Sequence, residues 1–125
     1  MGRSLKVLLD SCVLIDHLGG HAAARDYLKT VRGGAIGLIT WIEVSVGGQE
    51  AADQAVLQGF LANFEVLPVD QPVAEATVQL RRHRRLKLPD AVILATARVH
   101  GRVLATRNTK DFSADEPGVA IPYVL

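Results

Sequence analysis

Short apolar runs along this chain alternate with longer segments in which apolar residues recur every three or four positions. Runs of this length are typical of strands that are covered on both faces of a sheet. The predicted strands cover Leu5 to Leu9, Ala35 to Ile39, Phe64 to Val69 and Arg102 to Ala105. A last strand is expected over Ala120 to Val124, at the edge of the sheet, because Pro122 cannot donate a hydrogen bond inside a ladder.

The segments between the strands have the helical period and are bounded by glycine, proline and capping residues. Thr40 and Glu43 have the spacing of a capping box, which would start one of these helices. The predicted helices run approximately from Val13 to Leu18, His21 to Arg32, Thr40 to Gly47, Glu50 to Asn63, Pro72 through Leu80 into the basic residues that follow, and Pro89 to Gly101, with a short helix after Asn108.

Strands that alternate with helices predict an α/β protein with a mostly parallel sheet of four or five strands and right-handed crossovers. The chain has 125 residues, of which 49% are hydrophobic and 22% are charged. This size and balance fit one globular domain that buries its own core. We therefore expect residues 1–125 to form a single domain.

The composition excludes several kinds of protein. The apolar runs are much shorter than the ~18 residues that a membrane-spanning helix requires, and the first residues lead directly into a predicted strand without a secretory signal pattern. A cytoplasmic protein without membrane contact is expected. The single cysteine, Cys12, cannot form an internal disulfide and is expected to be a small buried residue. The four histidines lack the paired spacing of zinc ligands.

Four acidic residues stand where a predicted strand ends or a predicted helix begins, namely Asp10, Glu43, Asp90 and Asp111. The carboxyl ends of parallel strands share one rim, where such folds bind ligands. Two carboxylates about 4 Å apart repel by roughly 4 kcal/mol at an effective dielectric constant near 20. A gathered set of acids therefore implies a divalent cation and, with it, phosphate chemistry. Each acid alone has a structural alternative as a helix cap or a first-turn acid, so the set is more informative than its members.

The other acids have no place at this rim. Asp16 and Asp26 are expected on exposed faces of the first two helices, and Asp16 is only a weak candidate for the site. Asp53, Glu65 and Asp70 are expected to be solvated.

The net charge of +1 hides a strong asymmetry along the chain. Residues 33–80 contain six acids and no lysine or arginine, whereas residues 81–110 contain nine basic residues and only Asp90 as an acid. Uneven charge of this kind often marks a surface that binds a polyanion or an acidic partner. The alternative for the cluster from Arg81 to Arg85 is a solvated helix end, where positive charge favours the helix dipole.

Each of the four acids lies in a short characteristic segment. The segments are LLDSCVLI at 8–15, TWIEV at 40–44, LPDAVILATA at 88–97 and TRNTKDF at 106–112. In order and separation they resemble the four motifs of PIN-domain nucleases, and most closely those of the VapC-like toxins of bacterial toxin–antitoxin pairs. The resemblance covers nearly the whole chain. It implies a three-layer α/β/α domain and a Mg²⁺- or Mn²⁺-dependent endoribonuclease, which is usually a homodimer and is held inactive by an antitoxin.

By position, the resemblance assigns the acidic set to Asp10, Glu43, Asp90 and Asp111, with Ser11, Thr106 and Asn108 as polar support. Cys12 stands where many members have asparagine. Asp10 is the first choice as metal ligand, with Asp90 and Asp111 completing the set, and Asp111 ranks above Asn108 because it is charged. Glu43 would orient or deprotonate the attacking water.

Basic residues near the acids are candidates for contacts with the RNA backbone. They are Arg81, Arg82, Arg84, Arg85, Lys87 and Arg107. Two enzyme classes with similar folds fit less well, because a haloacid-dehalogenase-type phosphatase needs a second aspartate two residues after Asp10 and a receiver domain needs an acidic pair there. The remaining alternative is a catalytically inert module of the same fold that binds RNA or protein.

Overall fold

A parallel sheet of five strands lies at the centre of the computed structural model, which describes residues 6–31 and 34–125. The strand order is β3-β2-β1-β4-β5. The strands are β1 (Val7–Leu9), β2 (Ala35–Gly37), β3 (Glu65–Leu67), β4 (Val103–Ala105) and β5 (Val119–Ala120). Each neighbouring pair is parallel, which confirms the predicted α/β class. Leu5, the predicted start of the first strand, lies outside the described residues.

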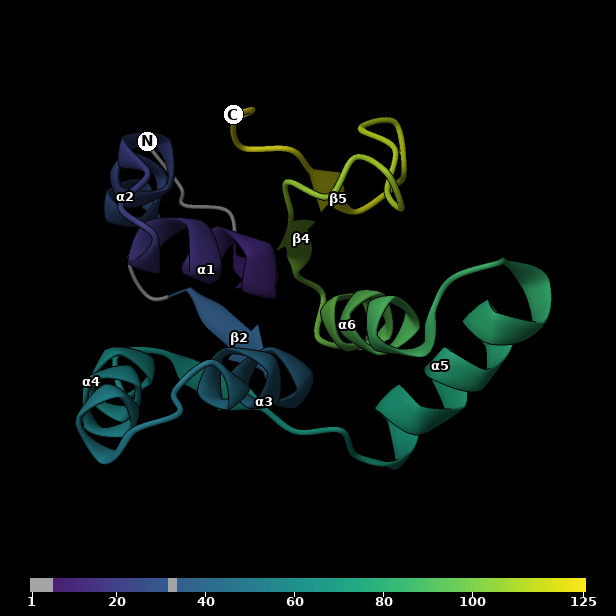
Figure 1. The fold of residues 1–125 in the computed structure, drawn as a ribbon. Helices are drawn as coiled ribbons and strands as arrows, with labels where there is room; N and C mark the ends of the chain where they lie inside the picture. Colours follow the sequence, from purple (N-terminus) through teal and green to yellow (C-terminus); the bar gives the residue numbers. More distant parts are fainter. Residues whose placement is uncertain (1–5, 32–33) are drawn as a thin grey trace.

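Helices cover both faces of the sheet (Figure 1). They are α1 (Ser11–Leu18), α2 (Ala22–Thr30), α3 (Leu38–Val46), α4 (Ala51–Leu61), α5 (Gln71–His83) and α6 (Leu88–Val99). One core cluster joins Val7 and Leu9 of β1 to residues of α1–α4, and the other joins Leu8 to residues of α6 and to Leu80 of α5. The successive side chains of β1 therefore point into different cores, as strand geometry requires, and the three-layer arrangement is confirmed.

The chain reverses its direction of sheet growth at β1. From β1 it builds outward through β2 and β3, and after α5 and α6 it returns to place β4 on the other side of β1. Leu9 at the end of β1 pairs with Ala105 at the end of β4. The residues that follow both strands therefore emerge side by side at the switch point, where open α/β sheets form their binding crevice.

The predicted capping box at Thr40 is wrong. Helix α3 begins at Leu38 with Gly37 as its N-cap, and the Thr40 side chain is buried with its hydroxyl donating to the Leu9 carbonyl at 3.4 Å. Strand β2 ends at Gly37, two residues earlier than predicted, because α3 begins at Leu38; Gly37 itself packs against α6, where a Cβ would come within 3.0 Å of Ile93. Tertiary packing thus overrides a local pattern that is otherwise a valid helix start.

Other element boundaries differ from the prediction by a few residues. Strands β3 and β5 are shorter than expected, and β5 begins one residue earlier and ends before Pro122. The short helix predicted after Asn108 is wrong, since this segment forms turns. The predicted end of α6 at Gly101 is confirmed by a left-handed φ of +64° there. Arg32 and Gly33, the predicted end of α2, lie outside the described residues.

Within residues 6–31 and 34–125, no helix has both the length and the apolar character that crossing a membrane requires.

Candidate active site

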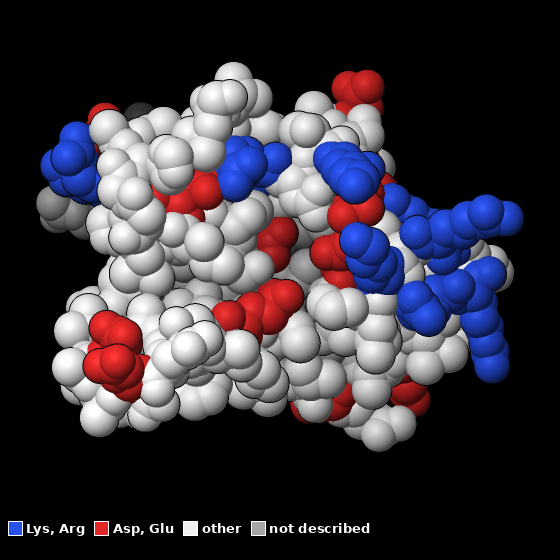
Figure 2. Space-filling model, viewed as in Figure 1, with Lys and Arg blue, Asp and Glu red and all other residues white. Residues whose placement is uncertain are grey.

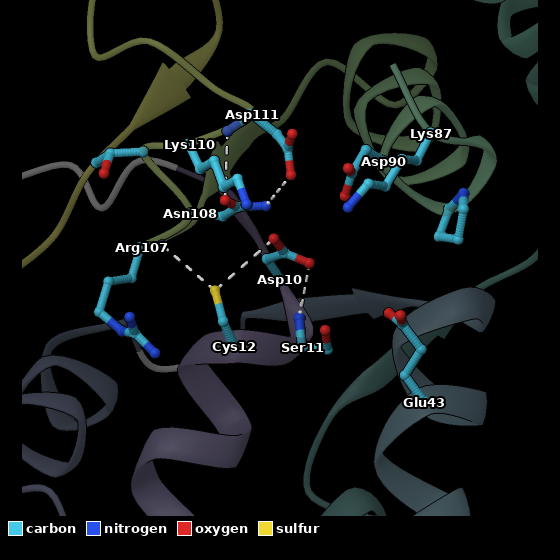
Figure 3. Close-up of a pocket in the computed structure, with 12 residues that line it drawn as sticks. Asp10, Ser11, Cys12, Glu43, Lys87, Asp90, Arg107, Asn108, Lys110 and Asp111 are labelled. Carbon is cyan, nitrogen blue, oxygen red and sulfur yellow. Dashed lines mark hydrogen bonds between the residues drawn. The ribbon is translucent and has the colours of Figure 1, made fainter.

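A cavity of about 530 Å³ opens at the carboxyl ends of β1 and β4. All four acids predicted from the sequence line it, although they come from four separate parts of the chain (Figure 3). Its lining residues are Asp10, Ser11, Cys12, Glu43, Lys87, Pro89, Asp90, Arg107, Asn108, Thr109, Lys110 and Asp111.

Asp10 lies at the floor of this cavity. It directly follows β1, caps α1 by accepting a hydrogen bond from the Ser11 amide at 2.8 Å, and is only 6% exposed. Its second carboxylate oxygen accepts a 2.7 Å hydrogen bond from the Thr106 hydroxyl, which follows β4. Burial raises the pKa of Asp10, although these hydrogen bonds oppose the shift. The hydrogen bonds thus fix the orientation of the carboxylate, but within the described residues no basic side chain pairs with its negative charge.

The segment after β4 holds a second acid at the rim. Asn108 donates from its side-chain amide to Asp111 at 2.9 Å, and the Asp111 amide donates back to the Asn108 side chain at 3.3 Å. The backbone amide of Asn108 in turn donates to the Thr106 hydroxyl at 3.0 Å. The hydrogen bond from Asn108, together with Lys87 and Lys110 nearby, holds the pKa of Asp111 below its ordinary value. Asp111 therefore stays ionised at neutral pH.

Asp90 and Glu43 face the same space from two helices. Asp90 is in the first turn of α6 and Glu43 is on α3. Burial, followed by the charges of Asp111 and Asp10, raises the pKa of Asp90 to about 6. Desolvation and the charge of Asp10 also raise the pKa of Glu43. The two carboxyls thus lie in an environment that resists additional negative charge.

The donor set fits a hydrated divalent ion. Within residues 6–31 and 34–125, no three acidic, histidine or cysteine side chains lie close enough together to share one ion as they stand. Mg²⁺ requires fewer protein ligands than that, since it keeps several waters and usually binds through one or two carboxylates and the substrate phosphate. Burial raises the pKa of Asp10, and burial together with the charges of Asp111 and Asp10 raises that of Asp90, so a bound cation would favour the ionised form of both carboxyls.

The pKa of Asp90 gives a prediction for stability without metal. Since the pKa of Asp90 is about 6 in the fold and 3.8 for the free side chain, its contribution to stability is fully present below pH 4 and is lost as the pH rises to 6. In EDTA, Asp90→Asn should melt at nearly the same temperature as the wild type at pH 4. Above pH 6 the variant should be more stable by about 1 kcal/mol, or ~4 °C. Thermal melts from pH 4 to pH 8 test this, and a pH-independent difference would contradict it.

Cys12 differs from the expected buried residue. It is half-buried, its sulfur accepts a hydrogen bond from the Arg107 amide at 3.3 Å, and it lies 3.5 Å from the Thr106 hydroxyl. Burial and the neighbouring Asp10 charge raise the pKa of the thiol. Cys12 thus stays a neutral thiol and helps to join α1 to the segment after β4.

The expected exposure of Asp16 is wrong. Asp16 is 5% exposed, forms a bidentate ion pair with Arg107 that includes a 2.7 Å hydrogen bond, and accepts a 2.8 Å hydrogen bond from the Tyr123 hydroxyl. Burial alone would raise the pKa of Asp16, but these contacts lower it below its ordinary value. Arg107 lies between Thr106 and Asn108, so this pair anchors the segment that positions Asp10 and Asp111. The sequence contains no local pattern that reveals it.

The candidate RNA-binding residues fall into two groups. Three of them are already engaged within the protein: Arg81 donates to the Leu86 carbonyl, Arg84 pairs with Glu116 at 2.6 Å, and Arg107 pairs with Asp16. In the described part of the chain, the exposed side chains of Arg82, Arg85 and Lys87 have no such partner.

Asp70, expected to be solvated, is exposed and caps α5 through the Val73 amide.

A parallel α/β/α fold with an acidic cavity at its switch point belongs to the class of open α/β proteins that bind their ligands outside the carboxyl ends of the strands. The model of the PIN domain family matches residues 7–115, and the chain belongs to this family.

Individual relatives support this assignment. The chain is 36% identical over 127 residues to "Ribonuclease VapC10" of Mycobacterium tuberculosis, covering 93% of this chain and 95% of the relative. A structure of a toxin–antitoxin complex from Klebsiella pneumoniae contains a chain that is 42% identical, with a TM-score of 0.90 and coverage of 96% of this chain and all of that one. The FitAcB structure from Neisseria gonorrhoeae is 27% identical, with a TM-score of 0.78 and coverage of 93% and 97%.

Proposed function

We propose that this protein is a metal-dependent endoribonuclease that acts as the toxin of a toxin–antitoxin pair, with residues 1–125 as one nuclease domain. The observation that carries the proposal is the convergence of Asp10, Glu43, Asp90 and Asp111 on one cavity. The relative from M. tuberculosis is named a ribonuclease, and the K. pneumoniae structure is a toxin–antitoxin complex. Crowded, partly desolvated carboxylates have a clear use in phosphodiester hydrolysis and none in an inert module.

The residues assigned to the metal in this proposal are Asp10, Asp90 and Asp111, and the ion is Mg²⁺ or Mn²⁺. Asp10 would bind the ion directly, and Asp90 and Asp111 would complete its shell or hold metal-bound water, which agrees with the one or two carboxylates that Mg²⁺ usually takes. Each supplies hard carboxylate oxygens, and Thr106 and Asn108 hold two of the carboxylates in place. When bound, the ion would polarise the phosphate and lower the pKa of water near it. The pKa of Asp90 is raised by burial and then by the charges of Asp111 and Asp10, and the ion would offset the repulsion from these two charges.

Glu43 is assigned to the attacking water. Glu43 lies on α3, which carries none of the other three acids, and it faces the same cavity. The pKa of Glu43 is raised towards physiological pH, which makes its carboxylate a better proton acceptor than that of an ordinary glutamate. Lys87 and Lys110 line the cavity and are placed to bind the phosphate oxygens beside the cleaved bond. Ser11 supports the site by fixing Asp10 through its amide.

The partners follow from the same proposal. The substrate is RNA, the regulator is a cognate antitoxin protein, and the active form is a homodimer in the cytoplasm, where its substrate is found. The exposed apolar residues of α3, which include Ile42 and Val46, supply surface for a protein partner.

Cleavage of a mixed RNA pool tests the function. Antitoxin-free protein is expected to cut RNA with Mg²⁺ or Mn²⁺, to stop in excess EDTA, and to recover when either ion is added back, because the acids alone repel the phosphate. Fragments resolved on a denaturing gel give the measurement. Folded protein that shows no metal-dependent cleavage would instead favour the inert RNA- or protein-binding module.

A further inference from the structure

The acidic cavity lies at the boundary between two differently charged surfaces. Residues 33–80 contain no lysine or arginine, and α3 and α4 carry acids such as Glu43 and Asp53. On the other side, basic side chains gather near the end of α5 and the start of α6. Figure 2 shows this blue cluster to the right of the acidic hollow, and it shows red without blue at the lower left, where α3 and α4 lie in Figure 1.

The basic surface contains both paired and free charges. Glu116 neutralises Arg84 and also pairs with Arg98 at 3.1 Å. Among the described residues, no ion pair or side-chain hydrogen bond involves the exposed side chains of Arg82, Arg85, Lys87 and Lys110. Lys87 and Lys110 line the cavity, whereas Arg82 and Arg85 lie outside it, at the last turn of α5 and in the loop to α6. The free cations thus continue from the cavity in one direction.

We propose that the RNA strand leaves the cavity on this side only, with its phosphates held first by Lys87 and Lys110 and then by Arg85 and Arg82. This inference rests on the proposed ribonuclease function and adds the course of the substrate. Free cations bind a polyanion by releasing its counterions, whereas cations already paired within the protein contribute less. The direction therefore follows from where the unpaired cations lie relative to the cavity.

The opposite course is electrostatically unfavourable. A strand that crossed α3 and α4 would pass acidic side chains without any lysine or arginine of residues 33–80 to offset them. At 0.1 M salt, charges interact over about 10 Å, which is enough for surface acids to repel a neighbouring phosphate. The surface formed by α3 and α4 is consequently expected to make no contacts with the substrate.

Removing two free cations outside the cavity tests the course directly. Arg82→Ala/Arg85→Ala should raise the KM for a long RNA oligonucleotide about 25-fold at 0.1 M salt and reduce the slope of log KM against log salt by about 1.4, since each single-strand phosphate contact contributes ~0.7. The kcat should not change, because neither arginine lines the cavity. Arg25→Ala/Lys29→Ala removes two exposed cations from α2, which lies across the molecule from α5 (Figure 1), and should leave KM nearly unchanged; of these two, Arg25 is paired with Asp26 at the surface.

Oligonucleotide length gives a second measurement that does not depend on how Arg82 affects α5. Extending a minimal substrate on one side of the cleaved bond should lower the wild-type KM, and extending it on the other side should not. The single variant Arg85→Ala, in the loop after α5, should weaken the benefit of the productive extension.

The outcomes separate the two proposals. Wild-type protein without metal-dependent cleavage would refute the ribonuclease function and this inference with it. A cleaving wild type in which both extensions help equally, or in which the Arg82/Arg85 variant matches the Arg25/Lys29 control, would overturn the one-sided course alone.

Discussion

Asp10→Asn is expected to reduce RNA cleavage by about a thousandfold or more while the protein stays folded. Asp10 is the most deeply buried acid of the cavity, and its carboxylate is fixed by Ser11 and Thr106. Asparagine keeps the size of the side chain and an acceptor for the Ser11 amide, but it lacks the charge that a divalent cation requires. Loss of one preorganised hydrogen-bond donor to a transition state typically costs about 10²–10³ in kcat, and loss of the ion should cost more.

The measurement combines single-turnover cleavage with Mn²⁺ binding by calorimetry. Both the cleavage rate and the affinity for Mn²⁺ should fall, and circular dichroism should be unchanged. Asp115→Asn is the matched control, because it removes the same charge from an exposed position outside the cavity and should retain full activity. Cleavage by Asp10→Asn within tenfold of the wild type would contradict the assignment of Asp10.

The position of the acids could be predicted because it depends on topology more than on detail. Asp10 follows β1 directly, and the segment containing Asp111 follows β4, so any parallel arrangement with these two strands adjacent brings them to one rim. Errors of one or two residues in the strand boundaries do not change which end of a strand a residue follows. The sequence alone therefore predicts that the acids converge on one rim of the sheet.

Predictions from the sequence are wrong where a contact with a distant part of the chain decides the environment of a residue. Thr40 has the spacing of a capping box, yet its hydroxyl reaches the Leu9 carbonyl, which is 31 residues away in sequence. Asp16 has the spacing of an exposed helical position, but its partners Arg107 and Tyr123 are 91 and 107 residues away. Helical periodicity describes which face a residue occupies and contains no information about what covers that face.

The cavity also shows a conflict between stability and the proposed activity. Asp10, Glu43 and Asp90 all have raised pKa values, so the folded protein without metal opposes their ionisation at neutral pH. Thr106 and Asn108 stabilise Asp10 and Asp111 but not Asp90. Asp90 should therefore gain most from a bound cation, and Mg²⁺ should raise the melting temperature more at pH 7 than at pH 5, where protons compete for the same carboxylates.

Asp16→Ala is expected to destabilise the protein by about 2–3 kcal/mol, which lowers the melting temperature by ~10 °C. The variant leaves the Arg107 guanidinium without its carboxylate and the Tyr123 hydroxyl without its acceptor. The cost lies below that of a fully buried pair because the Arg107 side chain is 33% exposed. Tyr123→Phe removes one hydrogen bond to a charged group and should cost about 1.5 kcal/mol.

Asp26→Ala is the matched control, because Asp26 lies on the neighbouring helix α2 and is paired with Arg25 only at the surface, where both side chains are more than half exposed. Surface pairs of this kind contribute at most about 1 kcal/mol. Urea denaturation of the three variants gives the comparison. Equal midpoints for Asp16→Ala and Asp26→Ala would mean that the buried pair does not stabilise the fold, and the anchoring of the segment between Thr106 and Asp111 through Arg107 would then have to be abandoned.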